Sequence, residues 1–263
     1  MSGLEKHIAI SKSLAEAGME TALPVLTKEN KEYYIDGELY FCLTNRIQGK
    51  CMKSSESYKE DYESKARYVG EIIGQLHLIL EKYDKEFVCN EPNLYKNIKE
   101  WAMPKVKKYM TLPNSFYEDY IENFEKLYPC LPKHIIHRDP NPNNIIMKDG
   151  RLAGFIDFEF LERNIRIFDP CYAATAILSE SFAENDHSKL EKWLVISRNI
   201  IEGYDSICNL SIEEKKAIPY VIYSIQMIFV SYFAGKYKYK ELVDVNKRML
   251  NWLYDNRASL TIK

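Results

Sequence analysis

A central run, HRDPNPNN at residues 137–144, constrains the fold of this chain more than any other part of the sequence. Its last five residues are two prolines and three asparagines, a combination that excludes a regular helix or a central strand. We therefore expect a loop here. Short β-like pieces flank it, and Asp149-Gly150 predicts a hairpin turn farther along the chain. That hairpin would bring Asp157 back beside the loop.

Three side chains of this region carry oxygen atoms suited to a hard cation: Asp139, Asn144 and Asp157. Two carboxylates and an amide oxygen suit Mg²⁺, which rarely has an all-protein cage and shares phosphate oxygens instead. Aspartate and asparagine are also common in turns for backbone reasons, so each residue taken alone would more often be structural. The joint pattern H-R-D-x₄-N followed by Asp-Phe-Glu is far more specific, and it favours a metal site.

Strands gather in the first fifth of the chain and in the central hairpin, and helices fill the rest. The expected elements are a helix over residues 4–17, a hairpin around Asp36-Gly37, a long helix over about 57–83, and two helices within 94–129. Capping boxes are predicted at Ser188-x-x-Glu191 and Ser211-x-x-Glu214. The pattern predicts an α+β fold, with a small β-containing lobe joined to a larger helical lobe near residues 45–50.

Composition and charge exclude several classes of function. The 36 Lys and Arg residues nearly balance the 38 Asp and Glu residues, and without a basic block this argues against a nucleic-acid partner. No stretch reaches the roughly 18 uninterrupted apolar residues of a membrane span, and the N-terminal segment is not typical of a signal peptide. The six cysteines form no C-x-x-C pair, so neither a zinc cluster nor a disulfide framework is indicated. We expect a cytoplasmic protein with no membrane partner.

The central run and residues 157–159 resemble the catalytic loop and the metal-binding segment of kinases, H-R-D-x₄-N followed by D-F-G. Here Glu159 replaces the glycine, only eleven residues separate Asp157 from Asp169, and no A-P-E follows. That spacing leaves no room for a protein-kinase activation loop. The chain is instead similar to the aminoglycoside phosphotransferase/choline kinase-like family of small-molecule kinases.

The resemblance extends to GQLH at residues 74–77 and to LYFCLTNRIQG at 39–49, which look like a family helix segment and a strand with its hinge. It implies a protein-kinase-like two-lobe fold, with a shortened N-terminal β lobe at residues 1–49 and a large, mainly helical C-terminal lobe at 50–263. The implied reaction moves the γ-phosphate of ATP or GTP to a hydroxyl of a small acceptor, aminoglycoside-like, choline-like or similar, with Mg²⁺ as the cofactor.

Carried over position by position, the resemblance also implies roles for individual residues. They are Asp139 as the catalytic base or orienting carboxylate, Asn144 and Asp157 as Mg²⁺ ligands, His137 and Asp169 as braces of the loop, and the backbones of Asn45 and Ile47 as nucleobase contacts. Glu159 is either a second metal or substrate contact or an ordinary solvated residue at a strand end. His77 is expected in the core or bracing the loop, and His134 and His187 at the surface.

The N-terminal part departs from the family pattern. The chain begins at a segment that resembles the family's αC helix, with Glu5 or His7 where the family keeps a glutamate, and it contains no G-x-G-x-x-G loop with a following β3 lysine. Three expectations stay open: an internal start, an enzyme that holds its nucleotide differently, or a kinase-fold binding module without phosphoryl transfer. The complete set of Asp139, Asn144 and Asp157 favours an enzyme, because folding alone does not require all three.

Overall fold

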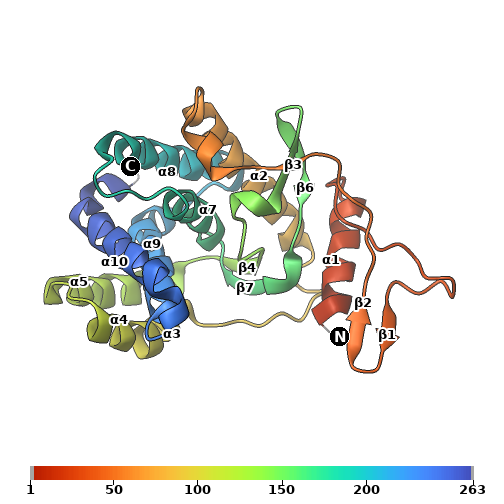
Figure 1. Cartoon of the computed structure of the whole chain (residues 1–263), viewed down its shortest axis with the longest axis horizontal. Helices are drawn as coiled ribbons and strands as arrows, with labels where there is room; N and C mark the ends of the chain where they lie inside the picture. The colour runs from red at the N-terminus through yellow and green to blue at the C-terminus, as the bar shows by residue number, and fades with distance from the viewer. Residues whose placement is uncertain (1–2, 262–263) are drawn as a thin grey trace.

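The computed structural model describes residues 3–261, which form an α+β fold of helices around three small antiparallel sheets (Figure 1). The helices are α1 (Gly3–Glu16), α2 (Tyr62–Lys82), α3 (Leu94–Asn97), α4 (Met103–Tyr109), α5 (Asn114–Asp119), α6 (Glu125–Leu127), α7 (Phe168–Ser179), α8 (His187–Cys208), α9 (Ile212–Phe233) and α10 (Lys240–Asp255). The strands are β1 (Tyr34–Asp36), β2 (Leu39–Phe41), β3 (Lys50–Cys51), β4 (Lys133–Ile136), β5 (Ile145–Lys148), β6 (Arg151–Phe155) and β7 (Glu162–Ile165). Within these residues, no helix is long and apolar enough to cross a membrane.

Helix α1 and the β1–β2 hairpin lie at one end of the molecule, and α3, α4 and α5 lie at the other (Figure 1). The predicted hairpin around Asp36-Gly37 is confirmed, with Ile35 opposite Tyr40. Gly37 has a φ of 58°, which glycine adopts at little cost and which this tight turn requires. The proposed lobe boundary between residues 49 and 50 stays a prediction.

Helices α2 and α8 cross in close contact at two glycines. A Cβ atom on Gly70 would overlap the carbonyl oxygen of Ile200, and one on Gly203 would overlap the carbonyl oxygen of Arg67. The absence of side chains at both positions therefore lets the two backbones touch. Elsewhere in the core, large side chains such as Trp193 are fully buried.

The two predicted capping boxes have different outcomes. The one at the start of α9 is confirmed, because the Ser211 hydroxyl accepts from the Glu214 backbone N–H and the Glu214 side chain accepts from the Ser211 N–H. The one at Ser188 is wrong. Helix α8 already begins at His187, and the Asp186 side chain caps it by accepting a hydrogen bond from the backbone N–H of Lys189.

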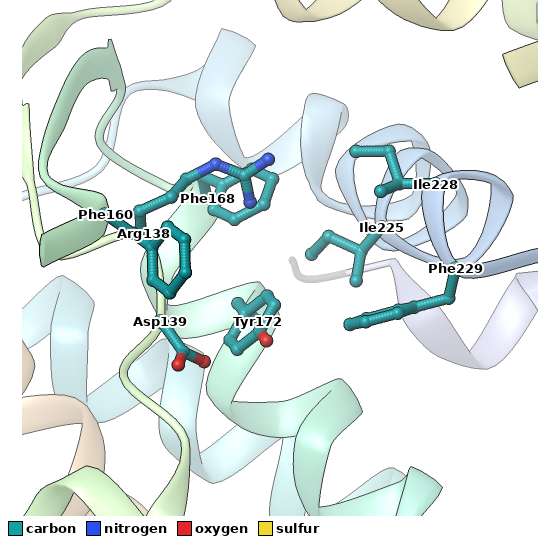
Figure 2. Close-up of a pocket in the computed structure, with 8 residues that line it drawn as sticks. All are labelled: Arg138, Asp139, Phe160, Phe168, Tyr172, Ile225, Ile228 and Phe229. Atoms are coloured by element: carbon teal, nitrogen blue, oxygen red, sulfur yellow. The ribbon is translucent and has the colours of Figure 1, made fainter. Parts of the chain in front are cut away.

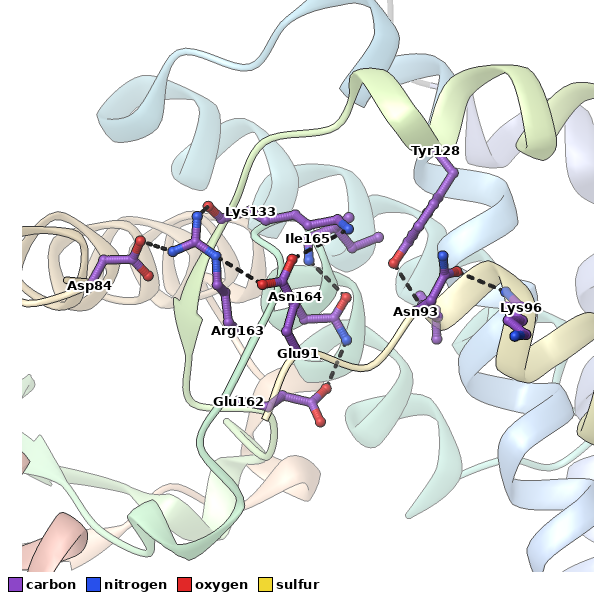
Figure 3. Close-up of polar contacts among 11 residues, drawn as sticks. Asp84, Glu91, Asn93, Lys96, Tyr128, Lys133, Glu162, Arg163, Asn164 and Ile165 are labelled. Atoms are coloured by element: carbon purple, nitrogen blue, oxygen red, sulfur yellow. Dashed lines mark hydrogen bonds and ion pairs between the residues drawn. The ribbon is translucent and has the colours of Figure 1, made fainter. Parts of the chain in front are cut away.

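Strands β4 and β7 pair at the centre of the molecule, and a polar cluster fixes this pair against its neighbours (Figure 3). Arg163 on β7 forms an ion pair with Asp84 and donates to the carbonyl of Lys133 at 3.3 Å. Asp84 also accepts from the backbone N–H of Ile135 at 2.9 Å. The segment after α2 is thereby tied to both strands, which holds the start of the following loop in one position.

Candidate functional site

Two antiparallel strand pairs bring the central loop and the Asp157 segment together. In the β4–β7 pair, Ile136 lies opposite Glu162, so the loop leaves β4 where β7 begins. In the β5–β6 hairpin the strands pair around the turn at 149–150, and the backbone N–H of Ile156 donates to the carbonyl of Asn144 at 3.1 Å. Asp157 therefore lies one residue beyond a direct contact with Asn144, as the sequence predicted.

The Asp139 carboxylate is held by two asparagines of its own loop. The Asn144 side-chain amide donates to the Asp139 carbonyl at 2.9 Å and to its carboxylate at 3.1 Å. Asn141 donates to the other carboxylate oxygen at 2.8 Å. Asn144 is buried, whereas Asp139 is partly exposed. The loop therefore presents a pre-oriented carboxylate to solvent.

The same contacts leave oxygen atoms available for a cation. Because the Asn144 Nδ2 faces Asp139, its Oδ1 faces away from that carboxylate. Asp157 is exposed and has a left-handed backbone, with φ 67°. Among residues 3–261 no group of three or more His, Cys, Asp or Glu side chains could hold a metal. Two hard oxygen donors fit Mg²⁺, which usually keeps several waters and shares phosphate oxygens.

Asp169, which is fully buried at the start of α7, fixes the other end of the loop. Its carboxylate accepts from the backbone N–H groups of His137 at 2.8 Å and Arg138 at 3.0 Å. Burial lowers the pKa of His77 to about 3, so that ring is neutral. Its Nε2–H donates to Asp169 at 2.9 Å, and its Nδ1 accepts from the Tyr204 hydroxyl at 2.8 Å. These bonds tie the loop to α2 and α8.

His137 lies beneath the loop and points toward the metal-binding segment. It is fully buried, its Nε2 donates to the carbonyl of Ile156 at 3.0 Å, and its ring lies 4.8 Å from the ring of Phe158. His137 and Asp169 thus contact the two segments that carry the candidate site. Their role in bracing it is part of the proposal below.

The expected surface position of His134 is wrong, because His134 is buried beside His77 with ring centroids 4.8 Å apart. Strand β4 is covered by α2, which a lone strand sequence does not reveal. Burial, followed by the neighbouring His77, lowers the pKa of His134 to about 4 from the usual 6.5. Below pH 6.5 the unfolded chain therefore binds a proton that the folded protein excludes. This stability is fully present above that pH and is lost as the pH falls toward 4.

We expect His134→Leu to flatten the acid limb of the stability profile. The lowered pKa of His134 contributes up to about 1.4 kcal/mol per pH unit to the slope of the unfolding free energy. Urea denaturation at stepwise pH between about 4.5 and 6 should show the variant losing that much slope. His187→Leu, at an exposed histidine, is the matched control and should keep the wild-type slope. An unchanged slope in His134→Leu would contradict the assignment.

A pocket of about 200 Å³ opens directly beside Asp139 (Figure 2). One wall comes from the loop, one from α7 and one from α9. The lining residues are Arg138, Asp139, Phe160, Phe168, Tyr172, Ile225, Ile228 and Phe229. Burial, followed by the neighbouring Asp139 carboxylate, raises the pKa of Tyr172. Most of the lining side chains are apolar, and the two charged ones, Arg138 and Asp139, belong to the loop.

A second pocket, of about 570 Å³, lies at the expected hinge and is lined by both Asn45 and Ile47. The backbone N–H of Asn45 donates to the Leu23 carbonyl at 2.9 Å, and its side-chain oxygen accepts from the Leu23 N–H at 2.5 Å. Asn45 is thus held in place by the neighbouring extended segment. Ile156, the residue before Asp157, lines the same pocket, so this pocket borders the candidate metal site.

The two candidates for the family's αC glutamate face different neighbours. Glu5 accepts a hydrogen bond from the Tyr33 hydroxyl at 2.9 Å. His7 packs against Phe158 with ring centroids 6.0 Å apart, and it lies near the carboxylates of Asp157 and Glu159. Burial lowers the pKa of His7, and the two carboxylates oppose that shift. His7 therefore faces the metal-binding segment from α1.

Sequence reasoning missed most of the pocket beside Asp139. Tyr172 follows Asp169 by three residues on α7, so helical spacing could have identified it as a neighbour of the loop. Ile225, Ile228 and Phe229 carry no such signal, because they belong to an apolar helix far along the chain.

The sequence family that matches this chain is described as the phosphotransferase enzyme family, and the match spans residues 3–197. The chain belongs to the phosphotransferase enzyme family. The match includes the central loop, Asp157 and α7, but not the α9 wall of the pocket beside Asp139. It confirms the resemblance inferred from the sequence.

Two homoserine kinases show how far this likeness extends along the chain. The one from Neisseria meningitidis is 23% identical over 216 residues, covering 81% of this chain and 65% of that protein. The one from Phenylobacterium zucineum is 30% identical over 99 residues, covering 38% of this chain and 28% of that protein. The chain thus spans less than two thirds of the length of these homoserine kinases.

Solved phosphotransferase structures share the fold. The GDP complex of aminoglycoside 2'-phosphotransferase-IIIa has a TM-score of 0.67 and 14% identity, covering 97% of this chain and 82% of that one. An amicoumacin kinase in complex with AMP-PNP, Ca²⁺ and Ami has a TM-score of 0.66 and 14% identity, covering 97% of this chain and 77% of that one. These likenesses confirm the predicted kinase-like α+β fold.

Proposed function

We propose that this phosphotransferase-family chain transfers the γ-phosphate of ATP or GTP to a hydroxyl group of a small acceptor with Mg²⁺ as the cofactor. The observation that carries the proposal is the Asp139 carboxylate, which lines a pocket and is held by Asn144. The backbone of Asn144 in turn contacts Ile156, the residue before Asp157. A reaction of this kind needs positioning and charge stabilisation more than covalent help from the protein. We propose that the protein acts in the cytoplasm on small molecules, without a nucleic-acid or membrane partner.

In the proposed reaction Asp139 orients the acceptor hydroxyl and accepts its proton. The acceptor oxygen forms a bond to the γ-phosphorus as the bond between that phosphorus and the bridging oxygen breaks. The products are a phosphate monoester and a nucleoside diphosphate. Asn144 and Asp157 would hold Mg²⁺, which when bound neutralises the charge of the phosphates. His137 and Asp169 keep the loop in the geometry that these contacts need.

The proposed nucleotide site is the pocket at the hinge. Ile47, Ile146 and Ile156 give it apolar surfaces for a flat base, and Lys50 and Lys53 add positive charge. The backbones of Asn45 and Ile47 are the proposed base contacts. The GDP and AMP-PNP complexes of the two structural neighbours support a nucleotide in this fold. The kinases named among the relatives support a small acceptor.

Calorimetry with Mg²⁺-ATP and Mg²⁺-GTP tests the nucleotide site without knowledge of the acceptor. We expect saturable binding by the wild-type protein to at least one of the two. Asp157→Asn should weaken it by about 10- to 100-fold, because the variant loses a charged metal ligand. Asp149→Asn makes the same change at the exposed turn of the same hairpin and should leave binding unchanged. Absence of binding at millimolar nucleotide would contradict the proposal.

A further inference from the structure

We propose that Arg138 binds an anionic group of the acceptor, and that the acceptor is therefore a small hydroxy acid. This inference rests on the proposed phosphotransferase function, and it adds the chemical class of the acceptor. It starts from the pocket beside Asp139, whose eight lining residues include one cationic and one acidic side chain. Figure 2 shows the Arg138 guanidinium and the Asp139 carboxylate directed toward different ends of the pocket.

The backbone of Arg138 has a conformation that does not favour arginine. Its φ is 75°, in the left-handed region where glycine is at ease and a side chain adds strain. The hydrogen bond from its backbone N–H to Asp169 needs no side chain. An arginine at this position therefore indicates a role for the side chain itself.

The Arg138 guanidinium is held by two neighbours, and the edge that carries its two terminal nitrogens stays available to a ligand. Its Nε lies 2.6 Å from a Glu162 carboxylate oxygen, and the guanidinium lies over the Phe168 ring at 3.9 Å. Glu162 in turn accepts a hydrogen bond from the Asn164 side chain at 2.7 Å. A guanidinium has five N–H donors, and one carboxylate at the Nε side engages at most two of them. The outer edge keeps the paired donors that bind a carboxylate in a bidentate manner.

The same arrangement disfavours cationic acceptors. A polyamine sugar needs several carboxylates, but among residues 3–261 Asp139 is the only acidic residue that lines the pocket. A quaternary ammonium group would share this pocket with the positive charge of Arg138, which repels it.

The remaining walls define the rest of the acceptor. Ile225, Ile228 and Phe229 of α9 offer apolar surface between the polar ends. An acceptor that satisfies both ends has a hydroxyl at Asp139 and a carboxylate at Arg138, joined by a short aliphatic chain. Transfer to it follows the balance given above, with the hydroxyl proton passing to Asp139 and the carboxylate unchanged.

The test compares matched acceptors that differ in one group. The probes are 4-hydroxybutyrate and homoserine as hydroxy acids, 1,4-butanediol as the neutral analogue, and choline as the cationic one. We expect kcat/KM to be highest for a hydroxy acid. Arg138→Met should raise KM for that acid by about 30-fold or more while changing kcat far less, because it removes one partner of a charge pair. Arg138→Lys should restore part of the loss.

Arg151→Met, the same change at an exposed arginine of the β5–β6 hairpin, is the control and should behave as wild type. Equal or better kcat/KM for 1,4-butanediol or choline would overturn the inference while leaving the proposed phosphotransferase intact. So would an Arg138→Met variant that loses activity equally on the acid and the diol. Absence of transfer to every acceptor would contradict the proposed function instead. In that case calorimetry with 4-hydroxybutyrate still decides the inference, which requires binding by the wild type that Arg138→Met abolishes.

Discussion

Replacing Asp139 with alanine is expected to lower the rate of phosphoryl transfer by about 100- to 10,000-fold, the range for loss of a positioned general base. The reason is geometric, because no other acidic side chain of the described residues lines the pocket where the acceptor would lie. The measurement is kcat and KM with nucleotide and acceptor at saturating Mg²⁺. A fall in kcat with little change in nucleotide affinity is the expected pattern.

Stability must be measured alongside, so that a folding defect is not mistaken for lost chemistry. Asp139 is partly exposed, and the hydrogen bonds that its carboxylate accepts from Asn141 and Asn144 lie within its own loop, so the alanine variant should unfold within about 1 kcal/mol of the wild type. Asp139→Asn should lose activity to a similar extent, because it keeps the shape but not the base. Asp149→Asn is the control at an exposed turn. Full activity in Asp139→Ala would show that this carboxylate is not the base.

The largest loss of stability is expected from Glu214→Ala. Glu214 is fully buried, and its two carboxylate oxygens accept from Arg166 at 2.7 and 2.8 Å. It also accepts from the backbone N–H of Ser211 at 2.9 Å, which completes the capping box of α9. The variant leaves Arg166 without its partner and α9 without half of its cap. We expect the free energy of unfolding to fall by about 3–5 kcal/mol.

A control substitution at a neighbouring residue and a double variant test whether the loss comes from the Arg166–Glu214 ion pair. Glu213→Ala removes an exposed glutamate from the same helical turn and should change the unfolding free energy by less than about 0.5 kcal/mol. Arg166→Met combined with Glu214→Leu should recover most of the loss, because it leaves no buried charge unpaired. Chemical denaturation of the four proteins measures this directly. A Glu214→Ala variant as stable as Glu213→Ala would refute the account.

Features set by a few adjacent residues could be predicted from the sequence. The turns at Asp36-Gly37 and Asp149-Gly150 need only the preference of glycine for positive φ, and both form hairpins. The central loop follows from its prolines and asparagines. The approach of Asp157 to the central loop then follows from the β5–β6 hairpin. The start of β5, which follows the loop, lies beside the end of β6, which precedes Asp157. These local signals bring the candidate site residues into one region of the fold, and the roles of those residues stay a prediction.

Features set by distant packing could not be predicted. His134 is buried only because α2 covers β4, and its own strand sequence is compatible with either face. The pocket beside Asp139 needs Phe168 on α7 and Phe229 on α9, which the chain brings together through the helical core. The choice between Glu5 and His7 depends on the rotation of α1, and the structure directs His7 toward Phe158. In each case the sequence does not show which face of a helix or strand packs against which distant element.

The alternative that the sequence left open, a binding module without transfer, differs from an enzyme in one observable. Phosphorus NMR of the protein with Mg²⁺-nucleotide and 4-hydroxybutyrate or homoserine follows every phosphate species at once. We expect a growing phosphate-monoester signal matched by an equal amount of nucleoside diphosphate, with both formed at least about 100-fold more slowly by Asp139→Ala. Nucleotide that binds but stays unchanged with every acceptor, in a wild-type protein of verified fold, would contradict it.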